Sequence, residues 1–407
     1  MPISTPTTSP ARLRAARAAV AACFFTNAVL YANLVPRLPE VKDRLGLSNG
    51  SLGAALAAFP LGALVAALAS AALMRRFGSA RVASWGLVLL AFVMWGAAVA
   101  PSWPVLAAVL FLGGALDAVV DVAQNAHGLR VQRGYNRSIL NGFHGLWSIG
   151  AVTGGLIGSA AAGLRIPLPV HLAGSAVVFA VLALLAYRGM LPGPDQEDRD
   201  AAASVPGAPP PAGAGRTAGR AAVPALAALG VLAACGAFVE DAGASWSALY
   251  LRGELAAGAA TAGLAFVALQ AAMTVGRLTG DRVVDRFGQR RVARVGGGLI
   301  AAGMGLALAL PSVPTTLVGF GLAGLGVATL VPAVYAAADD LPGLRHGVGL
   351  TWINWLLRIG FLLSPPLIGA LADATSLRVA LLTVVLAGVG TLVLGRVLRV
   401  SVARVGG

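Results

Sequence analysis

The sequence reads Arg-Phe-Gly-Ser-Ala-Arg at residues 76–81, and it returns as Arg-Phe-Gly-Gln-Arg-Arg at residues 286–291. A second motif recurs at the same offset of 210 residues, since Pro-Ser-Trp-Pro at 101–104 matches Pro-Ser-Val-Pro at 311–314. Two unrelated motifs that share one offset indicate an internal duplication, with a repeated unit of about 180 residues. Duplicated halves are typical of membrane transporters.

The composition is that of a membrane protein. Of the 407 residues, 57% are hydrophobic and 11% are charged, and a soluble domain of this length could not bury so much apolar surface. A helix rises 1.5 Å per residue, so about 20 apolar residues cross a hydrocarbon core of about 30 Å. Twelve such spans are predicted, at residues 15–36, 48–73, 82–100, 105–126, 138–164, 170–186, 223–250, 257–284, 292–310, 315–338, 348–371 and 377–398. We therefore expect an all-α integral membrane protein with twelve transmembrane helices in two six-helix bundles.

The positive charges are distributed unequally between the loops. When both termini are placed on one side, 22 of the 30 Lys and Arg residues flank the spans on that side, and only six lie in the opposite loops. The positive-inside rule therefore predicts cytoplasmic N- and C-termini, in a bacterial inner membrane. The net charge of +14 follows this topology and does not indicate nucleic-acid binding.

The spans divide the chain into five parts. We expect a cytoplasmic N-terminus at 1–14, an N-terminal bundle at 15–190, a cytoplasmic linker at 191–222, a C-terminal bundle at 223–398 and a cytoplasmic C-terminus at 399–407. The linker is rich in Pro, Gly and Ala, a composition that cannot bury apolar area and is typical of a tether. A partner-binding role for the linker stays open.

This arrangement resembles the major facilitator superfamily. The resemblance is carried by the twelve spans in two sets of six, the central linker, and an Asp-Arg-x-Gly-x-Arg-type loop after the second and eighth spans. The second-half loop fits that motif, whereas the first-half loop has Arg75 where the family usually has Asp. The resemblance implies a charged cytoplasmic gate, here at Arg76, Gly78, Arg81, Arg277, Asp281, Asp285, Arg286, Gly288 and Arg290.

A narrower resemblance is carried by the fourth and fifth spans. Asp121 lies four residues before Asn125, and Asn141 and His144 follow. This pattern is similar to the fucose-permease-like and rhizopine-transport-like branch, whose members include proton symporters for sugars. The resemblance implies that Asp121 carries the proton and that His144 lines a polar cavity. A carboxylate that the branch can carry late in the first span is absent from this chain.

The fourth span also indicates function from its residues alone. Asp117, Asp121 and Asn125 follow one another at i, i+4 and i+8, so they share one face of a helix. An ionisable group at membrane depth costs at least about 2.5 to 3.5 kcal/mol, so it normally faces a cavity or a partner. We predict proton coupling at Asp121 and Asp117. The alternative is a structural role, as a cap or in an ion pair.

The seventh span carries Glu240, Asp241 and Trp246. Adjacent acids on a helix point about 100° apart, so Glu240 and Asp241 are not expected to form a dyad. Glu240 is predicted to face the cavity and to assist proton coupling, with Trp246 as a ring on which a sugar or a cation stacks. An aromatic belt near the outer surface is the alternative for this end of the helix.

The eleventh span presents a polar stripe, because Thr351, Asn354, Trp355 and Arg358 lie at i, i+3, i+4 and i+7. Arg358 is expected to bind an anionic solute, to act on the carboxylates, or to form a fixed interhelical ion pair. The predicted solute-binding residues are Asn27, Asn33, Asn125, Asn141, His144, Trp246, Gln270, Asn354, Trp355 and Arg358.

Other kinds of chemistry are not indicated. Cys23 and Cys235 both lie in apolar spans, and they predict neither a disulfide nor a thiolate metal site. The sequence contains no Cys/His cluster for a metal and no Ser/His/Asp set in an accessible loop. We therefore expect no cofactor, no metal and no enzymatic activity.

The sequence thus predicts a secondary transporter that moves a small polar organic solute, such as a sugar or polyol, by alternating access with proton symport. The expected partners are the solute, protons and the lipid bilayer, for a chain that works as a monomer. Two alternatives stay open: a proton-antiporting exporter of a metabolite or drug, and a membrane sensor or scaffold that does not transport.

Overall fold

The computed structural model describes residues 9–135, 138–193, 222–339, 341 and 348–398. Within these ranges the regular secondary structure is helical throughout. Twelve helical segments there are long and apolar enough to cross a membrane, so the all-α class and the number of spans are confirmed. Residues 194–221 of the predicted linker, residues 1–8 of the predicted N-terminus and the whole predicted C-terminus, 399–407, lie outside the described residues. Residues 10–14 of the predicted N-terminus belong to the first helix.

The first half contains six spans, and the first of them continues past its predicted end into a short 3-10 helix and then α2. Ser48 begins the second span as an N-cap, because its side chain accepts a hydrogen bond from the backbone N–H of Ser51. The helices are α1 (Pro10–Ala32), η1 (Val35–Arg37), α2 (Leu38–Leu45), α3 (Asn49–Phe77), α4 (Ser79–Val99), α5 (Trp103–Arg133), α6 (Leu140–Gly163) and α7 (Leu168–Gly189).

The second half also contains six spans, three of which are divided into shorter helices. α10 and α11 form one span, α13 and α14 another, and the last span joins α16, α17 and η2. The helices are α9 (Ala222–Gly253), α10 (Ala259–Ala262), α11 (Leu264–Phe287), α12 (Gln289–Ala309), α13 (Val313–Val327), α14 (Leu330–Asp339), α15 (Val348–Ala374), α16 (Leu377–Ala380), α17 (Leu382–Leu394) and η2 (Gly395–Val397).

The two repeated motifs adopt the same backbone conformation in both halves. Gly78 joins α3 to α4 with φ 80° and ψ 150°, and Gly288 joins α11 to α12 with φ 81° and ψ 147°. Glycine is suited to this turn because residues with a Cβ rarely adopt a positive φ. Ser102 and Ser312, which begin α5 and α13, have φ values of −155° and −152°. The duplication predicted from sequence is therefore visible in the backbone conformation at both motifs.

The halves are joined mainly by α3 with α15 and by α6 with α11, and α10 with α6 and α2 with α9 add smaller contacts. Gly53 allows the closest approach of α3 to α15, since a Cβ there would collide with the backbone carbonyl oxygen of Pro365. The Asp373 carboxylate at the end of α15 accepts hydrogen bonds from the backbone N–H groups of Asn49 at 2.8 Å and Gly50 at 2.7 Å. These contacts hold the halves together at one end of the molecule.

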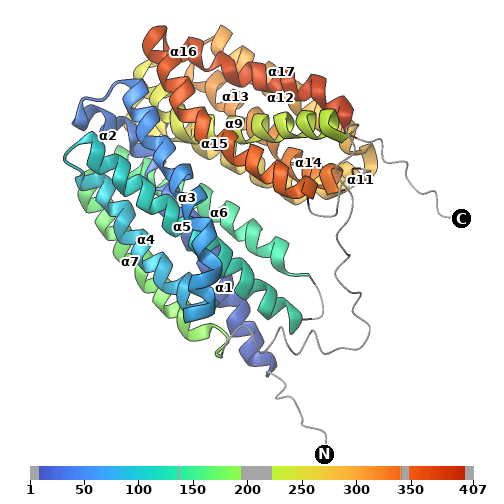
Figure 1. Cartoon of the computed structure of the whole chain (residues 1–407). Coiled ribbons are helices and arrows are strands. Elements are labelled where there is room, and N and C mark those ends of the chain that lie inside the picture. Colours follow the sequence, from blue (N-terminus) through green and yellow to red (C-terminus); the bar gives the residue numbers. More distant parts are fainter. Residues whose placement is uncertain (1–8, 136–137, 194–221, 340, 342–347, 399–407) are drawn as a thin grey trace, which may run out of the picture.

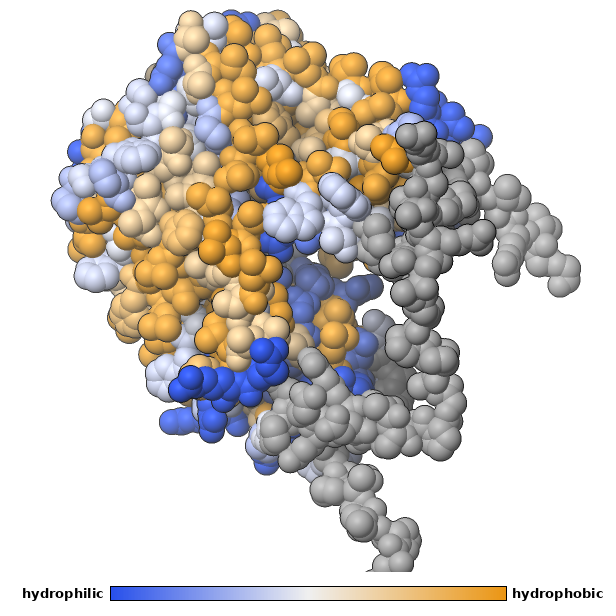
Figure 2. All heavy atoms as spheres, in the orientation of Figure 1, coloured by the Kyte–Doolittle hydropathy of each residue, from blue (hydrophilic) through white to orange (hydrophobic). Residues whose placement is uncertain are grey.

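The halves spread apart toward the other end. Figure 1 shows the first half in blue to green and the second in yellow to red, meeting near α2 and α16 and diverging toward the start of α1 and toward α14. In the same orientation, Figure 2 shows hydrophilic residues in the hollow between the halves and mainly apolar residues on the outer surface. A polar cleft therefore opens at the end that carries the N-terminus, while the apolar exterior suits lipid.

Candidate functional site

Asp117 lies half-buried on α5 and is held by a chain of hydrogen bonds from two other helices. Asn27 on α1 donates from Nδ2 to Asp117 Oδ1 at 2.8 Å. Trp147 on α6 donates from Nε1 to Asn27 Oδ1 at 3.0 Å. Asn27 is only 3% exposed, and both ends of its amide are used inside the bundle. In this structure it positions Asp117 and does not reach the cleft.

Asp121 lies one turn further along α5, toward the open end, and its side chain is exposed. Its Oδ1 accepts a hydrogen bond from Asn125 Nδ2 at 3.0 Å and a longer one from Gln124 Nε2 at 3.3 Å. Asn125 is predicted to bind solute, and here it orients the carboxylate on the same helix face. Asp121 is thus a held carboxylate with access to the cleft.

His144 on α6 brings the two halves into electrostatic contact. Its exposed ring meets Phe24 edge-on at 5.2 Å between centroids. The charges of Asp121 and of Arg277 on α11 both act on this imidazole. Arg277 Nη2 lies 3.5 Å from Glu240 Oε2 on α9. Arg277, which the sequence placed with the gate, therefore lies beside Glu240, the acid predicted to face the cavity.

The polar stripe of α15 lies opposite these acids. The charge of Arg358 acts on both Asp117 and Asp121 across the cleft, yet in the described part of the chain Arg358 has no carboxylate within 4 Å. Asn354 accepts a hydrogen bond from the Tyr335 hydroxyl at 3.2 Å, and Trp355 is 46% exposed. The stripe thus offers a cation, an amide and an exposed ring.

Asp241 on α9 is an additional carboxylate near this site, and the sequence-based analysis did not select it. Its Oδ1 accepts from Ser245 Oγ at 3.2 Å, and its Oδ2 is buried with no partner among the described residues. Tyr31 on α1 lies within electrostatic reach of Asp241 and of Asp117 in the other half. The spacing of Asp241 and Ser245 at i, i+4 was the available signal, because side chains four apart meet on a helix.

Besides Asn27, three predicted solute-binding residues lie away from the cleft. Asn33 is fully buried and donates to Ser175 Oγ at 2.9 Å, between α1 and α7. Trp246 is 0% exposed and packs in the main hydrophobic core. Gln270 is 4% exposed, and its Oε1 is buried without a partner in the described structure. By contrast, Asn141 at the start of α6 is exposed.

The predicted gate residues lie at the open end and are mostly exposed. Arg76 and Arg286 each pack over the following phenylalanine ring, at 5.4 and 5.5 Å from its centroid. Arg81 donates to the Tyr187 hydroxyl at 3.4 Å. No ion pair within 4 Å joins the two motif loops among the described residues, as expected where the halves have spread apart.

The cleft combines titratable side chains with side chains that form hydrogen bonds. Asp117, Asp121, His144 and Glu240 can gain or lose a proton, and Arg358 can bind an anionic or hydroxylated group. No group of three or more His, Cys, Asp or Glu side chains within the described ranges could hold a metal ion. This chemistry fits coupled binding of a proton and a solute.

The sequence matches the family model of the Major Facilitator Superfamily over residues 20–250 and 226–405. Membrane protein MosC of Rhizobium meliloti is 30% identical over 376 residues, which cover 91% of this chain and 87% of that protein. The resemblance to this superfamily is therefore confirmed, and with it the prediction that the chain is a transporter and not an enzyme.

Solved structures agree in fold. The nucleoside transporter NupG superposes with a TM-score of 0.71 at 13% identity, covering 93% of this chain and 97% of its own. The fucose:proton symporter FucP of E. coli superposes with a TM-score of 0.58 at 18% identity, covering the same shares of each chain. At these identities the likeness establishes the twelve-span architecture.

Proposed function

We propose proton-coupled symport of a small polar organic solute for this chain, which belongs to the major facilitator superfamily and is a multi-pass transmembrane transporter. The solute class that fits the cleft best is a sugar, a polyol or a nucleoside-like molecule. The proposed location is the bacterial inner membrane, with both termini in the cytoplasm and a single chain forming the pathway.

The observation that carries this proposal is the exposed carboxylate of Asp121 in the cleft. A charge at membrane depth is costly, so an exposed acid there marks a functional path. Protonation removes this charge, and the halves can then close around the bound solute without burying an ion. Asp117, one turn away and held by Asn27 at 2.8 Å, is proposed as the second group of the same relay.

The solute is proposed to bind between the two polar walls described above. Asn125, Asn141 and His144 lie on the first wall, and Asn354, Trp355 and Arg358 on the second. Amides and an arginine donate hydrogen bonds to hydroxyl or carbonyl oxygens, and an exposed tryptophan stacks on the apolar face of a sugar ring. Two structural neighbours are described as a nucleoside transporter and a fucose:proton symporter, which supports polyhydroxylated solutes.

The coupling is proposed to work by alternating access. In the present conformation the contacts of α3 with α15 close one end and the cleft opens at the other. Rocking of the two bundles about the site would break the closed end and bring the motif loops together. The charges of the gate, including Asp281, Asp285 and Arg290, are proposed to hold that second state.

The proposal is tested by uptake in proteoliposomes, after a panel of sugars, polyols and nucleosides has been screened for thermal stabilisation at an acidic and a neutral pH. Asp121→Asn is expected to exchange solute across the membrane yet lower its proton-driven accumulation ratio to about 1, since an uncoupled carrier only equilibrates its solute. The matched control is Asp43→Asn, which changes an exposed acid on α2 outside the cleft.

Each outcome decides between mechanisms. Accumulation that survives in Asp121→Asn contradicts coupling through this residue. Solute efflux driven by an inward proton gradient would replace symport by the exporter alternative. Binding without any exchange in the unmodified protein would favour a sensor over a transporter.

A further inference from the structure

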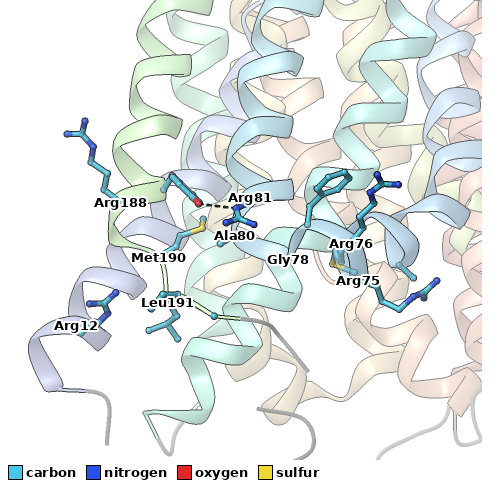
Figure 3. A pocket seen from close by; sticks show the side chains of 15 residues that line it. Arg12, Arg75, Arg76, Gly78, Ala80, Arg81, Arg188, Met190 and Leu191 are labelled. Carbon is cyan, nitrogen blue, oxygen red and sulfur yellow. Dashed lines mark hydrogen bonds between the residues drawn. The ribbon is translucent and has the colours of Figure 1, made fainter. Parts of the chain in front are cut away.

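A separate pocket of about 930 Å³ lies outside the cleft, in the first half, lined by the ends of α1, α3, α4 and α7. Figure 3 shows Arg81 with its hydrogen bond near the centre, Arg12 at the lower left, and Arg75 and Arg76 to the right, beyond Gly78. No carboxylate is among the described lining residues. The five arginines that line it are Arg12, Arg75, Arg76, Arg81 and Arg188.

The corresponding loop of the second half carries a different set of charges. At the offset of 210 residues, Asp285 corresponds to Arg75 and Asp281 corresponds to Ala71. Both Arg75 and Ala71 line the pocket. The second-half loop therefore carries two acids beside its arginines, whereas the first-half loop has lost both and gained a cation. In the described structure none of the five arginines has a carboxylate within 4 Å.

The wall formed by the chain after α7 is fixed by a different arginine. The Arg130 guanidinium on α5 donates to the backbone oxygens of Pro192 at 2.7 Å, Gly193 at 3.1 Å and Leu191 at 3.4 Å. These three residues line the pocket. Arg130 thus holds the wall in place. Among the pocket arginines, Arg81 donates one long hydrogen bond to the Tyr187 hydroxyl and Arg76 packs over Phe77, and a guanidinium with five N–H donors keeps further donors for a ligand.

An apolar track leads from the pocket toward the middle of the membrane span. On α3 the side chains of Leu61, Val65 and Leu68 are 41%, 54% and 84% exposed. Arg75 follows Leu68 by seven residues, which is about two helical turns. The three apolar side chains and Arg75 therefore lie on the same face of α3. The ligand that fits this arrangement has a negatively charged head and a long apolar tail.

We propose that this pocket binds an anionic phospholipid, with its phosphate among Arg75, Arg76 and Arg81 and an acyl chain along the exposed face of α3. The pocket lies at the ends of membrane spans, the depth at which headgroups lie, and on the side that the arginine distribution predicts to be cytoplasmic. Guanidinium groups bind phosphate oxygens through paired hydrogen bonds. Basic pockets on this side of a membrane favour anionic lipids. The proposal does not depend on the transported solute.

The test is native mass spectrometry of the full-length protein in detergent, titrated with dioleoyl phosphatidylglycerol, dioleoyl phosphatidylcholine or inorganic phosphate. We expect phosphatidylglycerol to bind more tightly than phosphatidylcholine. The double substitution Arg76→Ala with Arg81→Ala is expected to weaken phosphatidylglycerol binding by about 30-fold, because each arginine near an anionic membrane surface contributes to the attraction and two are removed. The single substitution Arg75→Asp restores the acid of the second copy and should also abolish the preference.

The matched control is Arg286→Ala with Arg291→Ala, at the duplicated positions of the second half. It removes the same net charge and is expected to keep the lipid preference. Equal binding of both lipids to the unmodified protein, or equal loss in the two double variants, would overturn the proposal. Saturation by inorganic phosphate at the same concentration as the lipid would assign the pocket to a soluble anion instead.

Discussion

Tyr31 lies within electrostatic reach of two carboxylates from opposite halves, Asp117 on α5 and Asp241 on α9. Its ring also packs against Phe59, at 4.8 Å between centroids. The charges of both carboxylates reach this tyrosine, so a change of protonation at one acid alters the electrostatic surroundings of a group that lies near the other. Protonation of Asp117 is therefore expected to affect the protonation of Asp241 in the other half. We add Asp241 to the proposed proton relay as a testable member.

Asp241→Asn is expected to keep solute exchange and to reduce proton-driven accumulation, as Asp121→Asn does. The physical reason is that Asn keeps the size and the hydrogen bond from Ser245 but cannot exchange a proton. Proteoliposome uptake under an imposed pH gradient measures the effect. Ser245→Ala is the control, since it removes the hydrogen bond and leaves the acid. Full coupling in Asp241→Asn would exclude Asp241 from the relay.

Sequence patterns located the acids of α5 because these lie at one helical spacing in an apolar span, and that signal is local. The spacing of Asp241 and Ser245 could mark this acid as a candidate, but its place near Tyr31, more than 200 residues earlier in the chain, is not visible in any local pattern. The same limit explains Asn33 and Trp246. Both are polar or aromatic residues in apolar spans, and only packing decides whether such a residue faces a cleft or a neighbouring helix.

At the scale of single elements, α3 and α15 control how the two halves meet. Hydropathy predicted both spans, because crossing a bilayer demands a continuous apolar helix. It could not predict the crossing, which depends on the absence of a Cβ at Gly53 against the backbone of Pro365. Hydropathy also ended the first span at residue 36, whereas the chain continues as helix to Leu45, beyond the apolar segment.

Gly53→Ala is expected to lower the unfolding midpoint of the solubilised protein, because overpacking a close contact costs about 1–3 kcal/mol. Gly142→Ala in α6 is the matched control, since an added Cβ there meets nothing within 4 Å. That control should be neutral or more stable by about 0.5–1 kcal/mol, the helical preference of Ala over Gly. A Gly53→Ala protein as stable as the control would contradict the tight crossing of α3 and α15.

At the scale of the whole molecule, transport requires the closed end to open. The contact of Asp373 with the start of α3 spans both halves, and a Cβ at Gly50 would lie 2.8 Å from the Asp373 carboxylate oxygen. The same Cβ would lie 3.8 Å from Asp373 Cγ, the atom that a cysteine sulfur would replace, so cysteines at these two positions are expected to form a disulfide. Oxidised Gly50→Cys with Asp373→Cys is therefore expected to lose transport and to regain it on reduction, while each single variant stays active under oxidation.

The oxidised double-cysteine variant can also show which side of the membrane the cleft faces. Asn141→Cys places a thiol at an exposed position at the start of α6, and the locked state keeps that end open. A membrane-impermeant thiol reagent should label it in inside-out vesicles and leave it unlabelled in intact cells, because the arginine distribution predicts a cytoplasmic opening. Labelling only from the outside would reverse the topology and move the basic pocket to the opposite leaflet. Transport that persists in the oxidised double variant would contradict rocking of the two halves about a central site.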